Sequence, residues 1–264
     1  MPMDGSEVWI AKPSITNQGL SVCIFNRVAD LEQAVQQAED IREWVIQRYI
    51  TPPLLIHGHK FHLRAYALCV GSLAVYVYDE VLVLLAGEEY DAGLNRLDNL
   101  ASHLTNTCQQ DGLDGEEGEK KVIKLLSELP QLLSEGGLPI CKAKERVAAV
   151  ETAVRSIIGE CLEAVSGELN FFTMPNCFEL FGFDLMVDAD WNCWVLEANA
   201  EPDFKQTGQR LRCIVDGLVE GVLRLVADPL AEEQGVRPPG EQEGVIGKGR
   251  WRKVLEKEQR PFFA

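Results

Sequence analysis

The sequence lacks closely spaced cysteines, glycine-rich phosphate motifs and any long uninterrupted apolar run. Its eight cysteines are never closer than 16 residues, which excludes CxxC metal and redox motifs and fits reduced, buried thiols. Neither GxxxxGKS/T nor GxGxxG occurs, so neither a P-loop nor a Rossmann site is supported. The most apolar stretch, residues 63–87, is interrupted by Arg64, Asp79 and Glu80, so it does not predict a membrane span.

Basic residues are scarce as well. The 264 residues include 25 Lys and Arg against 41 Asp and Glu, which gives a formal net charge of −16. Nucleic acids and anionic membranes are bound by basic surfaces, so we expect the protein to bind neither. No signal peptide opens the chain, and we expect a cytoplasmic protein. An apolar fraction of 46% is enough for a full core, in one large domain or two small ones.

The order of strand and helix patterns predicts an α+β fold. Runs rich in β-branched and aromatic residues predict strands at 8–12, 21–25, 44–50, 60–70 and 72–78. Apolar periodicity and capping residues predict helices at 144–165, at 208–226, at 29–42 opening at Asp30, and up to Leu129 before Pro130. Residues 111–119 are expected to form an exposed loop, and the tail from Pro229 to be loosely ordered apart from a short helix at 250–258. Strands that return at 177–200 indicate mainly antiparallel pairing.

The most informative segment is 177–204, which predicts a β-hairpin with its turn at 188–192. Centring the turn between Asp190 and Trp191 places Asp184 opposite Glu197, with Asn199 beside Gly182. The same register gives the other face only apolar side chains. Their expected cross-strand pairs are Val187 with Trp194, Leu185 with Leu196, Phe183 with Ala198, and Phe181 with Ala200.

The polar face of this hairpin predicts a site for a hard cation. Carboxylates directly opposite each other lie roughly 5 Å apart and repel. Two carboxylates and a carboxamide at that distance, from Asp184, Glu197 and Asn199, form an oxygen cluster suited to Mg²⁺. The alternative is a wet sheet edge whose register is shifted by one or two residues.

The strand at 60–66 carries a second polar face. Lys60, His62, Arg64 and Tyr66 alternate with apolar residues and therefore share one side. Two cations and an imidazole on one face predict an anion site, although an ordinary solvated face would show the same pattern. A hard-cation cluster combined with an Arg/Lys face indicates phosphoryl chemistry, because both neutralise phosphate charge.

Two other metal patterns fail on spacing. His57, His59 and His62 match no closed zinc arrangement and have no cysteine nearby. The segment from Asp188 begins like a calcium loop, but Cys193 stands where glycine is needed and Asn199 where a bidentate glutamate is needed. We interpret it as a turn.

These segments, in this order, resemble the tubulin-tyrosine ligase family of the ATP-grasp superfamily, with the fungal branch most similar. The matching motifs are WIAKPS (9–14), VIQRYI (45–50), KFHLRAY (60–66), HLTNTC (103–108), FGFDLMVD (181–188) and WVLEANAEPDF (194–204). Some relatives in that branch are linked to cytoplasmic mRNA-processing bodies. The resemblance implies an ATP-grasp-like fold of antiparallel-rich sheets with flanking helices, and a nucleotide site between two β-rich layers.

The resemblance also implies the roles of individual residues in that site. Lys12 and Lys60 would contact the phosphates and the base region of the nucleotide. The hinge that lines the adenine would consist of Gln47, Arg48, Tyr49 and Ile50. His62 stands where the family usually has an acidic nucleotide contact. Arg64 would stabilise the acyl-phosphate transition state or hold the acceptor carboxylate, with Thr105 and Asn106 lining the acceptor region. Asp184, Glu197 and Asn199 would hold Mg²⁺, in agreement with the hairpin argument.

The implied activity is ligation of a carboxylate to an amine. ATP would convert a carboxylate of a protein or peptide acceptor, tubulin in the family's name, to an acyl phosphate, which an amine then attacks. We expect residues 1–56 and 57–228 to form two ATP-grasp portions, 229–264 a tail, and the family's N-terminal domain to be absent.

Three departures favour a second hypothesis, a degenerate module that binds nucleotide or a protein without ligating. The loop at Thr16–Ser21 has one glycine and no arginine, His62 replaces an acid, and Leu84 stands where typical ligases have an arginine.

Overall fold

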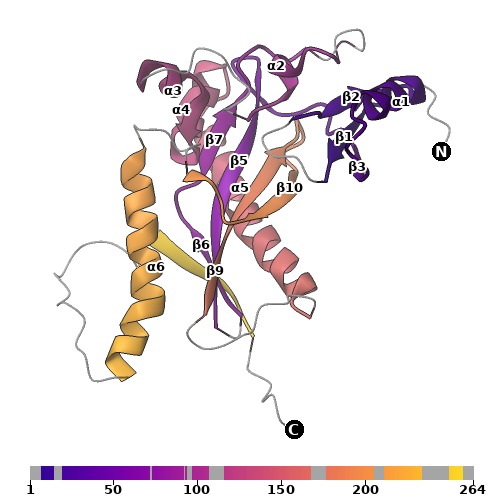
Figure 1. Cartoon of the computed structure of the whole chain (residues 1–264). Coiled ribbons are helices and arrows are strands. Elements are labelled where there is room, and N and C mark those ends of the chain that lie inside the picture. Colours follow the sequence, from indigo (N-terminus) through magenta and orange to yellow (C-terminus); the bar gives the residue numbers. More distant parts are fainter. Residues whose placement is uncertain are drawn as a thin grey trace.

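Two antiparallel sheets form the framework of the protein (Figure 1). The computed structural model describes residues 7–14, 20–71, 73–91, 93, 97–106, 116–167, 177–204, 211–233 and 250–257. A three-stranded sheet has the order β2-β1-β3 and carries helix α1. An eight-stranded sheet has the order β10-β9-β5-β6-β11, with β4 and β7 also paired to β5, and β8 paired to β7.

The strands and helices have the following bounds. The small sheet comprises β1 (Trp9–Pro13), β2 (Cys23–Phe25) and β3 (Trp44–Arg48). The large sheet comprises β4 (Leu55–Ile56), β5 (His59–Val70), β6 (Ala74–Tyr78), β7 (Leu82–Leu85), β8 (Ile123–Leu125), β9 (Phe178–Val187), β10 (Cys193–Ala200) and β11 (Trp251–Glu256). The helices are α1 (Val28–Gln37), α2 (Leu100–His103), α3 (Glu116–Val122), the 3₁₀ turn η2 (Leu126–Glu128), α4 (Leu129–Glu135), α5 (Ile140–Val165) and α6 (Arg212–Glu233).

The central strand β5 is covered on both faces. Alternate residues Phe61, Leu63 and Ala65 pack in one core with α4 and α5, which contributes an apolar stripe at three-to-four spacing. Tyr66 and Leu68 belong to a second core with α6. Among the described residues no helix is long and apolar enough to cross a membrane. The large sheet therefore lies between helices, with α4 and α5 on one face and α6 on the other.

Two predicted helices differ from the structure at their ends. Helix α1 begins at Val28, so Asp30 lies in its first turn and accepts hydrogen bonds from Arg27 instead of capping the helix. The helix expected up to Leu129 is wrong, because β8 and η2 interrupt it. Pro130 lies in the first turn of α4, where a missing backbone N–H breaks no helical hydrogen bond. The part of the expected loop at 111–115 lies outside the described residues.

The short helix predicted at 250–258 is also wrong. Residues Trp251–Glu256 form strand β11, which pairs antiparallel with β6 and sets Trp251 opposite Tyr78. Trp251 is buried, and its ring lies 5.0 Å from that of Tyr78. The conformation of this segment depends on the edge of β6 and on packing of the indole against Tyr78, and neither can be read from the local sequence pattern.

The predicted hairpin register is correct at its polar end and wrong near the turn. Asp184 lies opposite Glu197 and Gly182 opposite Asn199, as expected. An irregularity between Val195 and Glu197 shifts the rest, so Val187 pairs with Cys193 instead of Trp194. Such a β-bulge places two residues opposite one and breaks the alternation of faces. Trp194 is consequently 49% exposed and does not join the expected apolar face.

The segment from Asp188 that begins like a calcium loop is a turn. The carboxylate of Asp188 accepts hydrogen bonds from N–H groups of the same turn. Asp188 accepts hydrogen bonds from the backbone N–H groups of Asp190 (2.9 Å) and Asn192 (2.8 Å). The Asn192 amide and the indole of Trp194 (2.9 Å) also donate to it. Burial raises the pKa of Asp188, but the hydrogen-bond donors together outweigh it and hold the pKa below its usual value.

We expect Asp188→Ala to lower the free energy of unfolding by about 1–3 kcal/mol, because several donors lose their acceptor. Urea denaturation measures this change. The matched control is Asp190→Ala in the same turn, whose carboxylate accepts none of these bonds. The control should stay within about 0.5 kcal/mol of wild type. Equal effects of the two substitutions would contradict the role of Asp188 as anchor of the turn.

Candidate functional site

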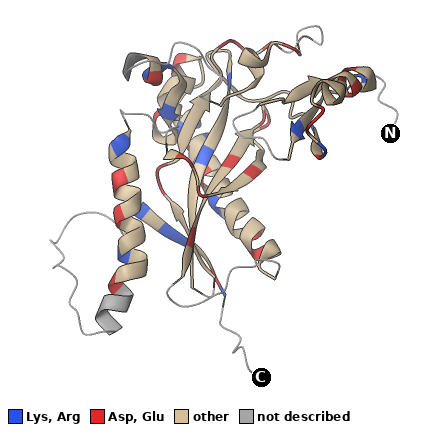
Figure 2. Cartoon of the chain, viewed as in Figure 1, with Lys and Arg blue, Asp and Glu red and all other residues tan. Residues whose placement is uncertain are grey.

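The polar face of β5 is buried, which rules out the solvated-face alternative. Lys60, His62 and Arg64 are only 4%, 4% and 3% exposed. Long cationic side chains are rarely buried without partners or a functional reason. Figure 2 shows basic positions on the central strand, with acidic positions on the neighbouring hairpin β9–β10. The partners of each side chain therefore decide what the face can bind.

Arg64 and Asp184 form a buried ion pair. They are direct cross-strand neighbours on β5 and β9. The guanidinium donates through Nε to Oδ1 and through Nη2 to Oδ2, the latter at 2.8 Å. Burial raises the pKa of Asp184, but the neighbouring His62 and Arg64 outweigh it and hold that pKa below the usual value. The carboxylate is therefore ionised and held in one orientation.

The other two predicted metal ligands lie beside this pair. Glu197 is directly opposite Asp184, is exposed, and accepts a hydrogen bond from the Asn199 amide at 3.1 Å. Within the described part of the chain no three His, Cys, Asp or Glu side chains form a metal cluster. The predicted set has only two such residues, and its third donor is an amide oxygen. Three oxygen donors fit Mg²⁺. A bound ion would compete with Arg64, which contacts both carboxylate oxygens of Asp184.

His62 bridges the ion pair and the acceptor region predicted at Thr105. Its Nδ1 lies 2.5 Å from the Thr105 hydroxyl oxygen. Its buried Nε2 has no hydrogen-bond partner among the described residues and lies 3.5 Å from Asp184 Oδ1. The pKa of His62 is lowered to about 4, mainly by burial; the Asp184 carboxylate opposes this shift and the nearby cations reinforce it. His62 is therefore a neutral ring at physiological pH. Asn106, the next predicted acceptor residue, is half-buried.

The two departures from typical ligases on this sheet are neighbours. His62 lies directly opposite Leu84 in the β5–β7 pairing, and Leu84 is fully buried. The resemblance implies an acid at position 62 and an arginine at position 84, whereas the two facing residues here carry no charge. Neither replacement leaves an unpaired charge in the core.

Lys60 lies at the other end of the polar face, against the small sheet. Its Nζ donates to the Tyr49 hydroxyl at 2.6 Å and lies 4.3 Å from the centroid of the Tyr49 ring. Burial and, to a smaller extent, the like charge of Lys12 lower the pKa of Lys60 to about 7. Lys12 belongs to β1, so two cations from different sheets converge here. Such a pair attracts an anion.

The remaining hinge residues lie along β3 and just after it. Gln47 pairs with Ile10, and Arg48 is exposed and forms an ion pair with Glu7. Only Tyr49 of the predicted hinge contacts the buried cluster; Ile50 follows it, half-buried. Four of the six residues of the predicted loop, Thr16 to Gly19, lie outside the described residues.

Sequence reasoning missed two contributors to this end of the site. His103 of α2 accepts from, or donates to, the Tyr49 hydroxyl through Nδ1 at 2.9 Å. The ring of Tyr90 packs edge-on against His103 with centroids 5.4 Å apart. His103 is the first residue of the HLTNTC motif, and this motif was the sequence feature that could have indicated its part in the site.

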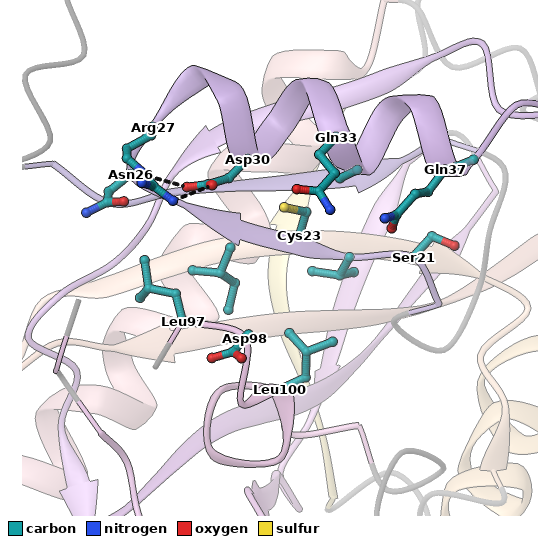
Figure 3. A pocket seen from close by; sticks show the side chains of 14 residues that line it. Ser21, Cys23, Asn26, Arg27, Asp30, Gln33, Gln37, Leu97, Asp98 and Leu100 are labelled. Atoms are coloured by element: carbon teal, nitrogen blue, oxygen red, sulfur yellow. Dashed lines mark hydrogen bonds and ion pairs between the residues drawn. The ribbon is translucent and has the colours of Figure 1, made fainter. Parts of the chain in front are cut away.

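An open pocket of about 990 Å³ lies elsewhere, between α1, β2 and residues 97–100 (Figure 3). Gln33 and Gln37 of α1 and Asp98 line it, and the pair Arg27–Asp30 closes one end. None of the predicted site residues lines this pocket. Lys60 instead lies near Lys12 of the small sheet, whose like charge contributes to its lowered pKa.

Comparisons with known proteins agree with this architecture. The profile of the tubulin-tyrosine ligase family matches residues 2–235. The chain is 29% identical over 267 residues to the probable tubulin–tyrosine ligase PBY1 of Saccharomyces cerevisiae, covering 85% of this chain and 34% of that protein. It is 30% identical over 259 residues to the probable tubulin–tyrosine ligase C12B10.04 of Schizosaccharomyces pombe, covering 87% of this chain and 60% of that protein.

A solved structure shows the same fold. The C-terminal domain of K. lactis Pby1, described as an ATP-grasp enzyme that interacts with the mRNA decapping enzyme Dcp2, superposes with a TM-score of 0.60 at 29% identity. The match covers 97% of this chain and 64% of that one. The chain thus spans less than two thirds of each of these relatives. The family profile and the solved structure agree: the chain belongs to the tubulin-tyrosine ligase family and has an ATP-grasp fold.

Proposed function

We propose that the chain is an ATP- and Mg²⁺-dependent carboxylate–amine ligase domain of the tubulin-tyrosine ligase type. The observation that carries this proposal is the division of charge along one buried face. Lys60 and Lys12 converge at one end without a carboxylate among their described contacts, and Asp184 lies near Glu197 at the other. A polyphosphate with a divalent cation satisfies both ends of such a site.

Each side chain has a part in binding or orienting the reactants. Lys12 and Lys60 bind phosphate oxygens, and the hinge from Gln47 to Ile50 lines the adenine. Asp184, Glu197 and Asn199 hold Mg²⁺, which would neutralise phosphate charge when bound. Arg64, fixed by its bidentate contact, orients the transferring phosphoryl group or the acceptor carboxylate. Thr105, held by His62, and Asn106 line the acceptor region.

The proposed chemistry has two steps. A carboxylate oxygen of the acceptor attacks the γ-phosphorus of ATP, which releases ADP and forms an acyl phosphate. An amine then attacks the acyl carbon, releases phosphate and leaves an amide bond. Holding both reactants in place can supply roughly 7–11 kcal/mol of such a barrier. We propose a protein or peptide as the acceptor. We also propose that residues 1–56 and 57–228 form the two ATP-grasp portions.

A nucleotide-binding or interaction module without ligase activity is the second candidate. The engagement of both Asp184 oxygens by Arg64 favours it, because a metal ion must compete with that pair. The K. lactis relative is described as interacting with Dcp2, so a partner from the mRNA-processing machinery is a proposal for this chain too. Retention of the whole Asp184, Glu197 and Asn199 set supports the ligase candidate more.

We expect ATP with Mg²⁺ to raise the free energy of unfolding by about 2.7 kcal/mol at a hundred times its dissociation constant. The physical reason is linkage, because the nucleotide binds the folded chain only. Glu197→Gln should lose most of this increase and stay folded, since its side chain is exposed. Urea denaturation with and without the nucleotide and metal measures both values.

Glu179→Gln is the matched control, since Glu179 lies on β9 opposite Cys69, away from the polar face. It should keep the full increase. If wild type and Glu197→Gln gain equally, Glu197 does not hold the ion. If Mg²⁺–ATP stabilises none of the three proteins, the proposed nucleotide function is wrong.

A further inference from the structure

Lys60 is a buried cation that no carboxylate neutralises within the described structure. The contacts that its ammonium makes with described residues are to the hydroxyl oxygen and the ring face of Tyr49. Lys12 of β1 adds repulsion, and the ring of His62, two residues along β5, is neutral. A buried ammonium in these surroundings loses its proton easily, and a neutral amine attracts phosphate poorly. The protonation state of Lys60 therefore depends on whether the Tyr49 hydroxyl accepts a hydrogen bond from it or donates one to it.

The Tyr49 hydroxyl lies between Lys60 and His103. Its oxygen is 2.6 Å from Lys60 Nζ and 2.9 Å from His103 Nδ1. All three side chains are nearly inaccessible to solvent. The His103 ring is held edge-on between Tyr49 and Tyr90, with centroid distances of 5.7 and 5.4 Å. The three groups form one fixed chain of hydrogen bonds.

The direction of the Tyr49 O–H bond decides which form of Lys60 is favoured. When the hydroxyl donates to His103 Nδ1, its lone pairs face Lys60 and accept from an ammonium. When no acceptor stands at position 103, the hydroxyl can turn and donate to a neutral amine. A hydrogen bond to the charged form favours that form, and one to the neutral form disfavours it.

We propose that His103 is a positioning residue that accepts the Tyr49 hydroxyl proton and thereby keeps Lys60 an ammonium ion aimed at the anionic phosphates of the nucleotide. The part of this proposal that concerns nucleotide phosphates rests on the proposed function. The effect of His103 on the charge of Lys60 rests only on the geometry of the three side chains. It requires His103 in the neutral form with its proton on Nε2. His103 does not itself touch the phosphates.

Three substitutions separate this role from simple packing. His103→Phe keeps an aromatic ring between Tyr49 and Tyr90 but removes the acceptor. His103→Asn returns an acceptor near the position of Nδ1. Tyr49→Phe keeps the ring under Lys60 and removes the hydroxyl. If His103 acts through the hydroxyl, Tyr49→Phe with His103→Phe should be no worse than Tyr49→Phe alone.

The first readout is calorimetric titration of the full chain with Mg²⁺–ATP and, separately, with adenosine. His103→Phe and Tyr49→Phe should each weaken ATP about tenfold, the scale of one hydrogen bond to a charged group. His103→Phe should not change adenosine affinity, because adenosine has no phosphates, and His103→Asn should recover most of the loss of ATP affinity. Equal losses for ATP and adenosine in His103→Phe, or ATP losses that multiply in the double variant, would overturn the proposal.

The second readout needs no nucleotide. The pKa of Lys60 is measured by NMR on lysine-labelled protein, with Lys60→Arg to assign the signal. Tyr49→Phe and His103→Phe should each lower it by about one unit. An unchanged pKa in His103→Phe overturns the proposal whether or not ATP binds. A lowered pKa in a protein that does not bind ATP upholds the effect of His103 on Lys60 and rejects the nucleotide function.

Discussion

Replacing Arg64 with methionine is expected to lower the free energy of unfolding by about 3–5 kcal/mol, because it leaves the Asp184 carboxylate buried without its partner. The side chains of Arg64 and Asp184 are only 4% and 7% exposed, so water cannot replace the guanidinium. Methionine keeps much of the volume of the arginine stem. The loss therefore reports the unpaired charge more than a cavity. Chemical denaturation at neutral pH measures the change.

Arg27→Met is the matched control, because it removes the same group from an exposed pair. Arg27 lies 2.7 Å from Asp30 but its side chain is 71% exposed, so its loss should change stability by less than about 1 kcal/mol. The Arg64 effect should also depend on pH. Since the folded pKa of Asp184 is lowered, the pair stabilises the protein above the usual value of about 3.9 and stops doing so as the pH falls through the folded pKa. An equal, pH-independent loss in both variants would contradict the ion-pair account.

Leu84→Arg is expected to lower the free energy of unfolding by about 3–5 kcal/mol, the scale of an uncompensated buried charge. Leu84 is fully buried, and the nearest cross-strand position holds a neutral His62 that cannot pair with a guanidinium. The control Leu84→Met conserves volume and polarity and should cost less than about 1.5 kcal/mol. Urea denaturation of both variants measures the difference.

His62→Asp combined with Leu84→Arg should recover about 2–3 kcal/mol of that loss, since directly opposed residues of opposite charge can pair. The coupling follows because positions 62 and 84 face each other in the β5–β7 pairing. If the effects of the two single substitutions simply add in the double variant, the two positions are independent, and the departures at His62 and Leu84 are two separate losses.

The elements with continuous local patterns could be predicted from the sequence. Residues Ile140–Val165 carry an apolar stripe at helical spacing and form α5. The alternation along 60–70 gave β5 and the shared side of Lys60, His62 and Arg64. Asp184 and Glu197 were paired correctly although the register near the turn is wrong, because the bulge lies between the turn and this pair.

Partners far apart in the chain could not be predicted from such patterns. The strand β11 depends on the free edge of β6, and the burial of β5 on both faces depends on α5 and α6. The bidentate contact of Arg64 with Asp184 joins residues 120 positions apart. Periodicity predicts which side of an element a residue occupies and carries no information about what covers that side.

The sequence by itself determined the α+β class, the central strand, the hairpin and the identity of the charged residues that share a face. Only the tertiary structure decided that this face is buried, that Asp184 is paired with Arg64, and that the Tyr49 hydroxyl lies between Lys60 and His103. The physical reason is that spacing along the chain fixes direction within one element. Burial, pairing and pKa depend instead on the surfaces of other elements, which meet only when the chain folds.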